Sequence, residues 1–166
     1  MVKFEKNNLI NETFGDAITT SFKVYDFNID DGKNYLKLSA KHNAYENNFN
    51  YIHERIIKID KKNSNLLGED SLIASSQNKK SLDMYNIRFH LYPGINAVQT
   101  MSKNSILIQI DKNKSLVFTS AGEDLILEKS IFLGRNKIIN NFCITITGTL
   151  KNSENKKITW ELKRNN

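Results

Sequence analysis

Strict alternation of apolar and polar residues recurs along the whole chain, while the spacing typical of an amphipathic helix is almost absent. Segments 87–91, 106–110 and 142–146 each carry an apolar residue at every second position. Because alternate side chains of a β-strand point to opposite faces of its sheet, each segment is predicted to be a half-buried strand. Similar runs occupy 36–40, 125–133, 158–162 and, with a change of phase near Tyr25, 22–29.

Short polar turns separate these predicted strands. Clusters rich in Asp, Asn, Gly and Ser lie at 30–32, 61–65, 111–114, 121–124 and 151–155. Such connections are too short for the crossover that joins two parallel strands. The sequence therefore predicts an all-β fold, an antiparallel β-sandwich of about ten to twelve strands. We expect a single domain over residues 1–166.

Length and composition limit the classes of protein this chain can belong to. Its 166 residues suffice for one hydrophobic core and are too few for two ordinary domains. The lone Cys143 excludes an intramolecular disulfide and a zinc cage built from thiolates. No apolar run approaches the length of a membrane span, and residues 1–10 lack the pattern of a signal peptide. We expect no membrane span and no export signal in this chain.

The formal charge of +6 is carried largely by lysines in the turns, as at 61–62 and 112–114. Solvation and protection of strand edges explain such lysines, and a negatively charged partner is the alternative interpretation. An acidic polysaccharide fits that alternative as well as a nucleic acid does. Because the chain has no basic helix and no aromatic-plus-basic motif of the RNA-binding type, we predict no nucleic-acid partner.

Arginine is rare, because only four of the 24 basic residues are Arg, at positions 55, 88, 135 and 164. A retained arginine suggests a planar or bidentate role that lysine cannot fill. His53 shares a strand face with Arg55, and Arg88 shares one with His90. If the two strands are neighbours, these side chains form one polar patch suited to a carboxylate or sulfate. Alternatively, the arginines pair with internal acids such as Glu69 or Asp70 and hold the sandwich together.

His42 and Tyr45 are the candidate catalytic residues. His42 continues the buried phase of 36–40 and is expected where its strand leaves the sheet, with Tyr45 following in a polar loop. A His and a Tyr close together suit proton transfer, whereas a tyrosine that caps the sandwich is the structural alternative. Without a HxH or HExxH pair, we predict no metal site and no cofactor in this chain. Cys143 is predicted to be a buried, inert thiol.

Five short strings of unusual residues follow one another in a fixed order: KHNAY at 41–45, YIHER at 51–55, LGEDSL at 67–72, IRFHLYP at 87–93 and ITWELKR at 158–164. Together they resemble the C-terminal part of heparinase II/III-like bacterial proteins, whose patterns look like HDGY, HxR, GED, RFHLxP and a closing W-x-L-R/K-R. The resemblance covers residues 37 to the C-terminus. The family's HDGY reads HNAY here, which argues against a catalytic role for the loop after His42.

The resemblance implies a polysaccharide lyase lineage, with an N-terminal α/α toroid followed by an antiparallel β-sandwich. Such enzymes cleave acidic, uronate-containing glycans by β-elimination. The family's base, acid and zinc motif lie mainly on the toroid or just upstream of the matched segment, so no zinc or other cofactor is expected in this chain. The implied partners are an acidic polysaccharide and, if it is encoded separately, the toroid. The implied location is the cell envelope or periplasm.

Three functional hypotheses follow from these observations. In the leading one, the chain is the lyase's C-terminal domain, with little lyase activity by itself. It supports the toroid and contacts anionic substrate. A stand-alone carbohydrate-binding or interaction module is the alternative, and an inert remnant of a decayed gene, with an exposed apolar sheet face, is the third. The polar cluster that either binds substrate or stabilises the fold comprises His53, Arg55, Asp70, Arg88 and His90.

Overall fold

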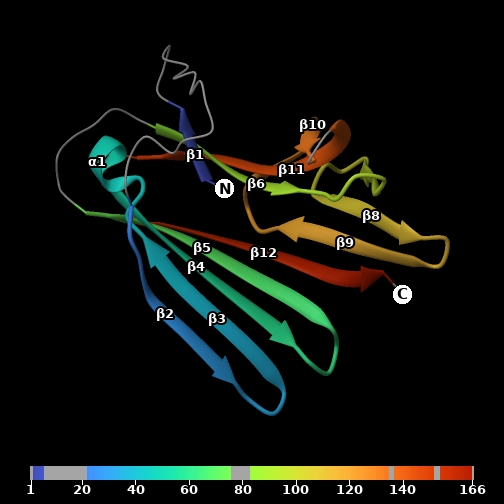
Figure 1. Ribbon diagram of the computed structural model, residues 1–166, viewed down its shortest axis with the longest axis horizontal. Coiled ribbons are helices and arrows are strands. Elements are labelled where there is room, and N and C mark those ends of the chain that lie inside the picture. The colour runs from blue at the N-terminus through green and yellow to red at the C-terminus, as the bar shows by residue number, and fades with distance from the viewer. Residues whose placement is uncertain (1, 6–21, 76–82, 135–136, 152–153, 166) are drawn as a thin grey trace.

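The alternating segments form two layers of antiparallel sheet in the computed structural model of the chain (Figure 1). The structure describes residues 2–5, 22–75, 83–134, 137–151 and 154–165, with the backbone alone for 2–5 and 83. A short helix, α1 (Glu46–Phe49), follows the third strand. The strands are β1 (Val2–Glu5), β2 (Val24–Asp31), β3 (Tyr35–His42), β4 (Tyr51–Asp60), β5 (Asn65–Ala74), β6 (Asp83–His90), β7 (Asn96–Gln99), β8 (Ser105–Asp111), β9 (Lys114–Ser120), β10 (Asp124–Leu133), β11 (Ile138–Leu150) and β12 (Lys156–Asn165).

The strands divide unequally between the two sheets. The small sheet has four strands in the order β1-β6-β11-β10, and the large sheet has eight in the order β2-β3-β4-β5-β12-β9-β8-β7. The paired strands run antiparallel, so the predicted sandwich is confirmed. The C-terminal strand β12 lies between β5 and β9 and thereby joins two groups of hairpins, as Figure 1 shows.

The turn clusters of the sequence coincide with connections between the strands. The change of phase near Tyr25 is an irregularity in the pairing of β2 with β3, at which Asp26 adopts a φ of 51°. This extra residue shifts the following side chains to the other face of the strand. β3 ends at His42, where the sequence predicted that the strand leaves the sheet. Arg135 and residues 152–153 of the last turn lie outside the described residues.

The hydrophobic core fills the space between the two sheets. Trp160 of β12 stacks on Phe118 of β9 at a centroid distance of 5.7 Å, and Phe89 of the small sheet meets the Trp160 ring edge-on at 4.7 Å. Apolar side chains removed from water in this way supply most of the stabilisation of such a sandwich. Fully buried members of this core include Leu72, Tyr85, Ile87, Ile106, Ile144, Ile146 and Ile158.

Four strands cannot cover eight, and the outermost strand of the large sheet is therefore exposed. On β2, the side chains of Val24, Phe27 and Ile29 are 62%, 66% and 53% exposed. The prediction of a half-buried strand at 22–29 was therefore wrong in burial, although the strand exists. Alternation fixes which residues share a face and does not show whether a second layer covers that face. No helix in the described ranges is long and apolar enough to cross a membrane.

Candidate functional site

A buried carboxylate, that of Asp70 on β5, is the centre of the most elaborate polar cluster in the described part of the chain. Asp70 has no solvent exposure. Its Oδ1 lies 2.7 Å from both His53 Nε2 and Arg55 Nε, and its Oδ2 accepts a hydrogen bond of 2.8 Å from Trp160 Nε1. Burial opposes ionisation, but the hydrogen bonds from His53 and Arg55 outweigh it and lower the pKa of Asp70. We call Asp70, His42, His53, Arg55 and Trp160 the Asp70 network.

Register explains how the Asp70 network assembles. Arg55 of β4 faces Asp70 of β5 directly, and His53 of β4 faces His42 of β3. Directly opposed residues of antiparallel strands place their side chains on the same face. Trp160 of β12 is opposite Gly68, two residues before Asp70. A Cβ atom at position 68 would lie 2.0 Å from Trp160 Cε2, so the indole reaches Asp70 only because residue 68 is glycine.

The two histidines form a chain of hydrogen bonds with one consistent direction. The Ala44 N–H donates to His42 Nδ1 over 3.3 Å, which leaves the proton of this ring on Nε2. His42 Nε2 then donates to His53 Nδ1 at 2.9 Å, and His53 Nε2 donates to Asp70. A proton on His42 Nδ1 would face the Ala44 donor. Burial, followed by the neighbouring His53 and Arg55, lowers the pKa of His42 to about 4.

Arg55 links the two sheets. Its guanidinium lies 5.5 Å from the centroid of the Phe89 ring on β6, a cation–π contact across the core. Its Nε balances the charge of Asp70, while its Nη2 is buried without a hydrogen-bond partner among the described residues. The predicted alternative, in which Arg55 pairs with the internal acid Asp70, is therefore the observed arrangement.

Tyr45 lies beside the histidines, as its sequence position suggested. Its ring meets the His42 ring at 5.2 Å and 60°, and its centroid is 6.5 Å from that of His53. Tyr45 directly precedes α1 and is half-buried. The structure thus brings the two catalytic candidates, His42 and Tyr45, together at the outer end of the Asp70 network.

Arg88 and His90 do not join this cluster. They belong to β6 of the small sheet, on the face opposite the core residues Ile87 and Phe89. Arg88 Nη2 lies 3.7 Å from Glu128 Oε1 on β10, and His90 Nδ1 is 3.3 Å from Ser130 Oγ. The expectation of a single patch with His53 and Arg55 was wrong because β4 and β6 lie in different sheets.

Two further expectations concern thiol and metal chemistry. Cys143 is buried, and burial raises the pKa of its thiol, as expected of an inert core cysteine. Among the described residues, no group of three or more His, Cys, Asp or Glu side chains is arranged to hold a metal ion.

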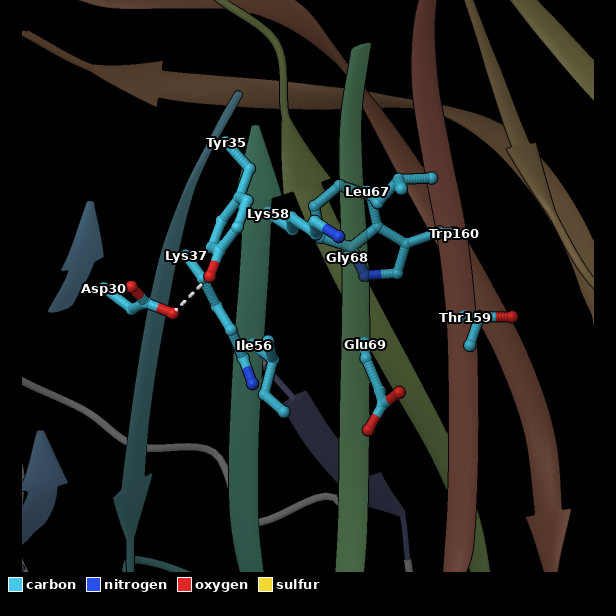
Figure 2. A pocket seen from close by; sticks show the side chains of 10 residues that line it. All are labelled: Asp30, Tyr35, Lys37, Ile56, Lys58, Leu67, Gly68, Glu69, Thr159 and Trp160. Carbon is cyan, nitrogen blue, oxygen red and sulfur yellow. Dashed lines mark hydrogen bonds between the residues drawn. The ribbon is translucent and has the colours of Figure 1, made fainter. Parts of the chain in front are cut away.

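The outer face of the large sheet, which points away from the core, carries a second feature that the sequence did not predict. An open hollow of about 580 Å³, within the roughly 300–1,000 Å³ of small-molecule sites, lies across β2, β3, β4, β5 and β12. We call it the outer hollow. Figure 2 shows its lining side chains, with the hydrogen bond from Tyr35 to Asp30 dashed. They are Asp30, Tyr35, Lys37, Ile56, Lys58, Leu67, Gly68, Glu69, Thr159 and Trp160.

Comparison with known proteins places this fold. The family model described as "Heparinase II/III-like, C-terminal" matches residues 14–161. The structure is similar to heparan sulfate lyase HepC from Pedobacter heparinus, with a TM-score of 0.72 and 17% identity over 86% of this chain and 22% of that one. A second similar structure is the heparinase III BT4657 gene product, with a TM-score of 0.69 and 12% identity over 89% of this chain and 22% of that one.

A structure described as heparinase III also matches, with a TM-score of 0.64 and 14% identity over 87% of this chain and 21% of that one. The chain thus spans about a fifth of the length of these solved structures. No curated protein sequence matches it. At such low identities the structural likeness shows a shared fold alone.

Proposed function

The chain belongs to the heparinase II/III-like family, as a C-terminal domain, and from this premise we propose that it is the C-terminal β-sandwich of a polysaccharide lyase. The proposed lyase cleaves acidic, uronate-containing glycans by β-elimination. The observation that carries the proposal is the match over residues 14–161, together with a fold shared with heparan sulfate lyase HepC. In keeping with the family, we place this lyase in the cell envelope or periplasm.

Within this lyase, we propose that the domain supports the reaction rather than performing it. A base for β-elimination must have a free lone pair directed at the substrate proton. The Asp70 network uses both ring nitrogens of His42 and of His53, and Asp70 already accepts from three donors. In keeping with the family, we assign the base, the acid and any zinc site of the lyase to its other parts.

We further propose that the helical N-terminal domain of the lyase packs on β2. Val24, Phe27 and Ile29 expose apolar surface along this edge strand. Exposed apolar clusters mark interaction surfaces in soluble proteins. The hypothesis of a decayed remnant also predicts exposed apolar surface, but with aggregation. A monodisperse chain in size-exclusion chromatography, at concentrations up to those used for spectroscopy, would contradict it.

An elimination assay tests the proposed function. The chain alone, incubated with a panel of acidic glycans, is expected to produce no ultraviolet absorbance of unsaturated uronate, whereas co-expression with the helical domain should give a complex that does. Robust turnover by the chain alone would contradict the supporting role. Replacing both Phe27 and Ile29 by Ser should weaken the complex, and Lys112→Gln, in an exposed turn, should leave it unchanged.

A carbohydrate-binding module without catalysis is the second candidate, and the outer hollow favours it. A module of this kind binds glycan without the helical domain and gives no elimination product with it. The assay above therefore separates the two candidates.

A further inference from the structure

Two lysines in the outer hollow lack the carboxylate partners that other lysines on the same face possess. Lys37 of β3 and Lys58 of β4 are directly opposed in the pairing of these strands. Nearby, Lys41 lies 3.0 Å from Asp26 and Lys157 lies 2.9 Å from Glu69. No carboxylate of the described residues lies within 4.0 Å of the amino group of Lys37 or of Lys58. Like charges placed directly opposite each other destabilise a sheet.

The carboxylates that line the hollow are engaged with other groups. Glu69 is paired with Lys157, and Asp30 accepts a hydrogen bond of 2.7 Å from the Tyr35 hydroxyl. Asp30 is opposite Lys37 in the register of β2 and β3, yet the two form no ion pair. The amino group of Lys58 instead lies 5.0 Å from the centroid of the Tyr35 ring. Lys37 and Lys58 therefore form no ion pair with a described residue, although Asp30 is opposite Lys37 and, besides hydrogen bonds to the carboxylate, the charge of Lys58 helps to lower the pKa of Asp60.

Beside the lysines, the sheet presents a short apolar floor. Ile56 and Leu67 project from β4 and β5, and Leu67 is 42% exposed. Thr159 and Glu69, opposed on β12 and β5, border this floor with oxygen atoms that can accept hydrogen bonds from hydroxyl groups. Figure 2 shows these side chains around one depression, with the aliphatic stems of the two lysines lying across the strands. Such a surface offers cations, apolar contact and hydroxyl partners side by side.

This combination of groups favours an acidic saccharide over a single-stranded nucleic acid as the ligand. Proteins bind single-stranded nucleic acids by stacking their bases on aromatic rings. The only aromatic ring that projects from the outer face into the hollow, among the described residues, is Tyr35, and Lys58 lies over it. A sugar ring needs no aromatic platform, because its C–H face packs on aliphatic side chains such as Ile56 and Leu67. Its sulfate or carboxylate groups then accept charge-assisted hydrogen bonds from the lysines.

We propose that the outer hollow is a binding site for an acidic saccharide, on the opposite face of the large sheet from the Asp70 carboxylate. A sulfate or carboxylate lies between Lys37 and Lys58, and the adjoining sugar ring packs on Ile56 and Leu67. The site holds the chain of an acidic polymer on the outer face of the sandwich. The inference rests on the proposed function only for the class of the ligand, because the site is defined by the lysines, the floor and the polar border.

Calorimetric titration of the full chain with a sulfated heparan hexasaccharide tests this site. The double variant Lys37→Gln/Lys58→Gln is expected to bind about tenfold or more weakly, because two charge-assisted contacts are lost. The matched control is Lys62→Gln/Lys112→Gln, which removes the same charge from exposed turns and should keep the wild-type affinity. Circular dichroism and thermal melting of both variants establish that each is folded.

Several results would overturn the site. These are absence of hexasaccharide binding by the wild-type chain, an equal loss in both double variants, and wild-type affinity in Lys37→Gln/Lys58→Gln. Competition by a single-stranded oligonucleotide at the same concentration would assign the surface to polyanions in general and overturn the selectivity for saccharide. Uncharged maltohexaose should not bind. The elimination assay of the previous section is independent of all these outcomes, so failure of the site leaves the proposed function standing.

Discussion

The inner and outer faces of the large sheet differ in how their charged side chains are paired. On the inner face of β4 and β5, Arg55 is opposite Asp70, and every oxygen of that carboxylate has a donor. On the outer face, Lys37 and Lys58 are opposed, and no carboxylate of the described residues lies within 4.0 Å of either amino group. A buried charge needs a partner within the protein because it has lost its hydration. An exposed charge stays hydrated and is available to a ligand. We infer that the charges of the inner face stabilise the fold and that those of the outer face bind a ligand.

The largest expected effect comes from Asp70→Asn. The substitution keeps the shape of the side chain but leaves Arg55 without its counter-charge and turns an amide donor toward other donors. Breaking a buried pair in this way costs about 3–5 kcal/mol of unfolding free energy. Urea unfolding followed by Trp160 fluorescence measures it. A loss below about 1 kcal/mol would place Asp70 among ordinary surface charges.

Glu69→Gln is the matched control, because residue 69 lies next to Asp70 on the same strand and points to the other face. Its pair with Lys157 is partly exposed, so its loss should cost roughly 0–1 kcal/mol. Equal losses at positions 69 and 70 would remove the contrast between the two faces.

Gly68→Ala should destabilise the inner face next most strongly. Its new methyl group would collide with the Trp160 indole, whose displacement also stretches the hydrogen bond to Asp70. Overpacking of this kind costs about 1–3 kcal/mol, measurable as a lower melting temperature. Gly134→Ala provides the control, because the nearest atom to its added Cβ is 3.4 Å away. Equal melting temperatures of Gly68→Ala and Gly134→Ala would contradict the prediction.

A smaller effect is expected from pH. The pKa of His42 is about 4 in the folded chain and 6.5 in its ordinary state, so the unfolded chain binds more protons between these values. Stability gained from the neutral ring is therefore complete above pH 6.5 and is lost as the pH falls toward 4. Because the ring is only partly buried, we expect a loss on the order of 1 kcal/mol.

Denaturant midpoints measured from pH 7 to pH 4 follow this loss. His42→Gln should flatten the profile in this window, whereas His90→Gln, on the exposed face of the small sheet, should leave it unchanged. A profile that keeps its slope in His42→Gln would assign the pH dependence to other groups.

The smallest expected effect on stability is that of Lys37→Gln. Removing one of two opposed ammonium groups relieves their repulsion, so the melting temperature should stay the same or rise slightly. The same variant should bind the sulfated hexasaccharide more weakly. A stability loss comparable to that of Gly68→Ala would show that Lys37 serves the fold instead of a ligand.

Alternation in the sequence predicted much of the fold because it is a local property. It placed His53 and Arg55 on one face of a strand, and the turn at 61–65 brings β5, with Asp70, beside them. Three members of the Asp70 network could thus be brought together by reasoning from the sequence. Its remaining members, His42 and Trp160, come from strands whose neighbours are fixed by the sheet order.

Sheet membership could not be predicted from periodicity. Arg88 and His90 have the same alternating pattern as His53 and Arg55, yet β6 pairs with β11 in the other layer. The outer hollow was missed for a related reason. Nothing in the sequence distinguishes Lys37 and Lys58 from the other lysines, and only the register of β3 with β4 shows that they are opposed. For the contact between Trp160 and Asp70, the signal available in the sequence was Gly68, but only the pairing of β5 with β12 shows that it lies beside Trp160.

The most direct test of the contrast between the faces is a nuclear magnetic resonance titration of the isotopically labelled chain with the sulfated hexasaccharide. We expect the side-chain amino resonances of Lys37 and Lys58 and the methyl resonances of Ile56 and Leu67 to shift with a common dissociation constant. The ring resonances of His53 should stay in place. Shifts confined to His53 and its neighbours in the Asp70 network, with Lys37 and Lys58 unmoved, would contradict this expectation.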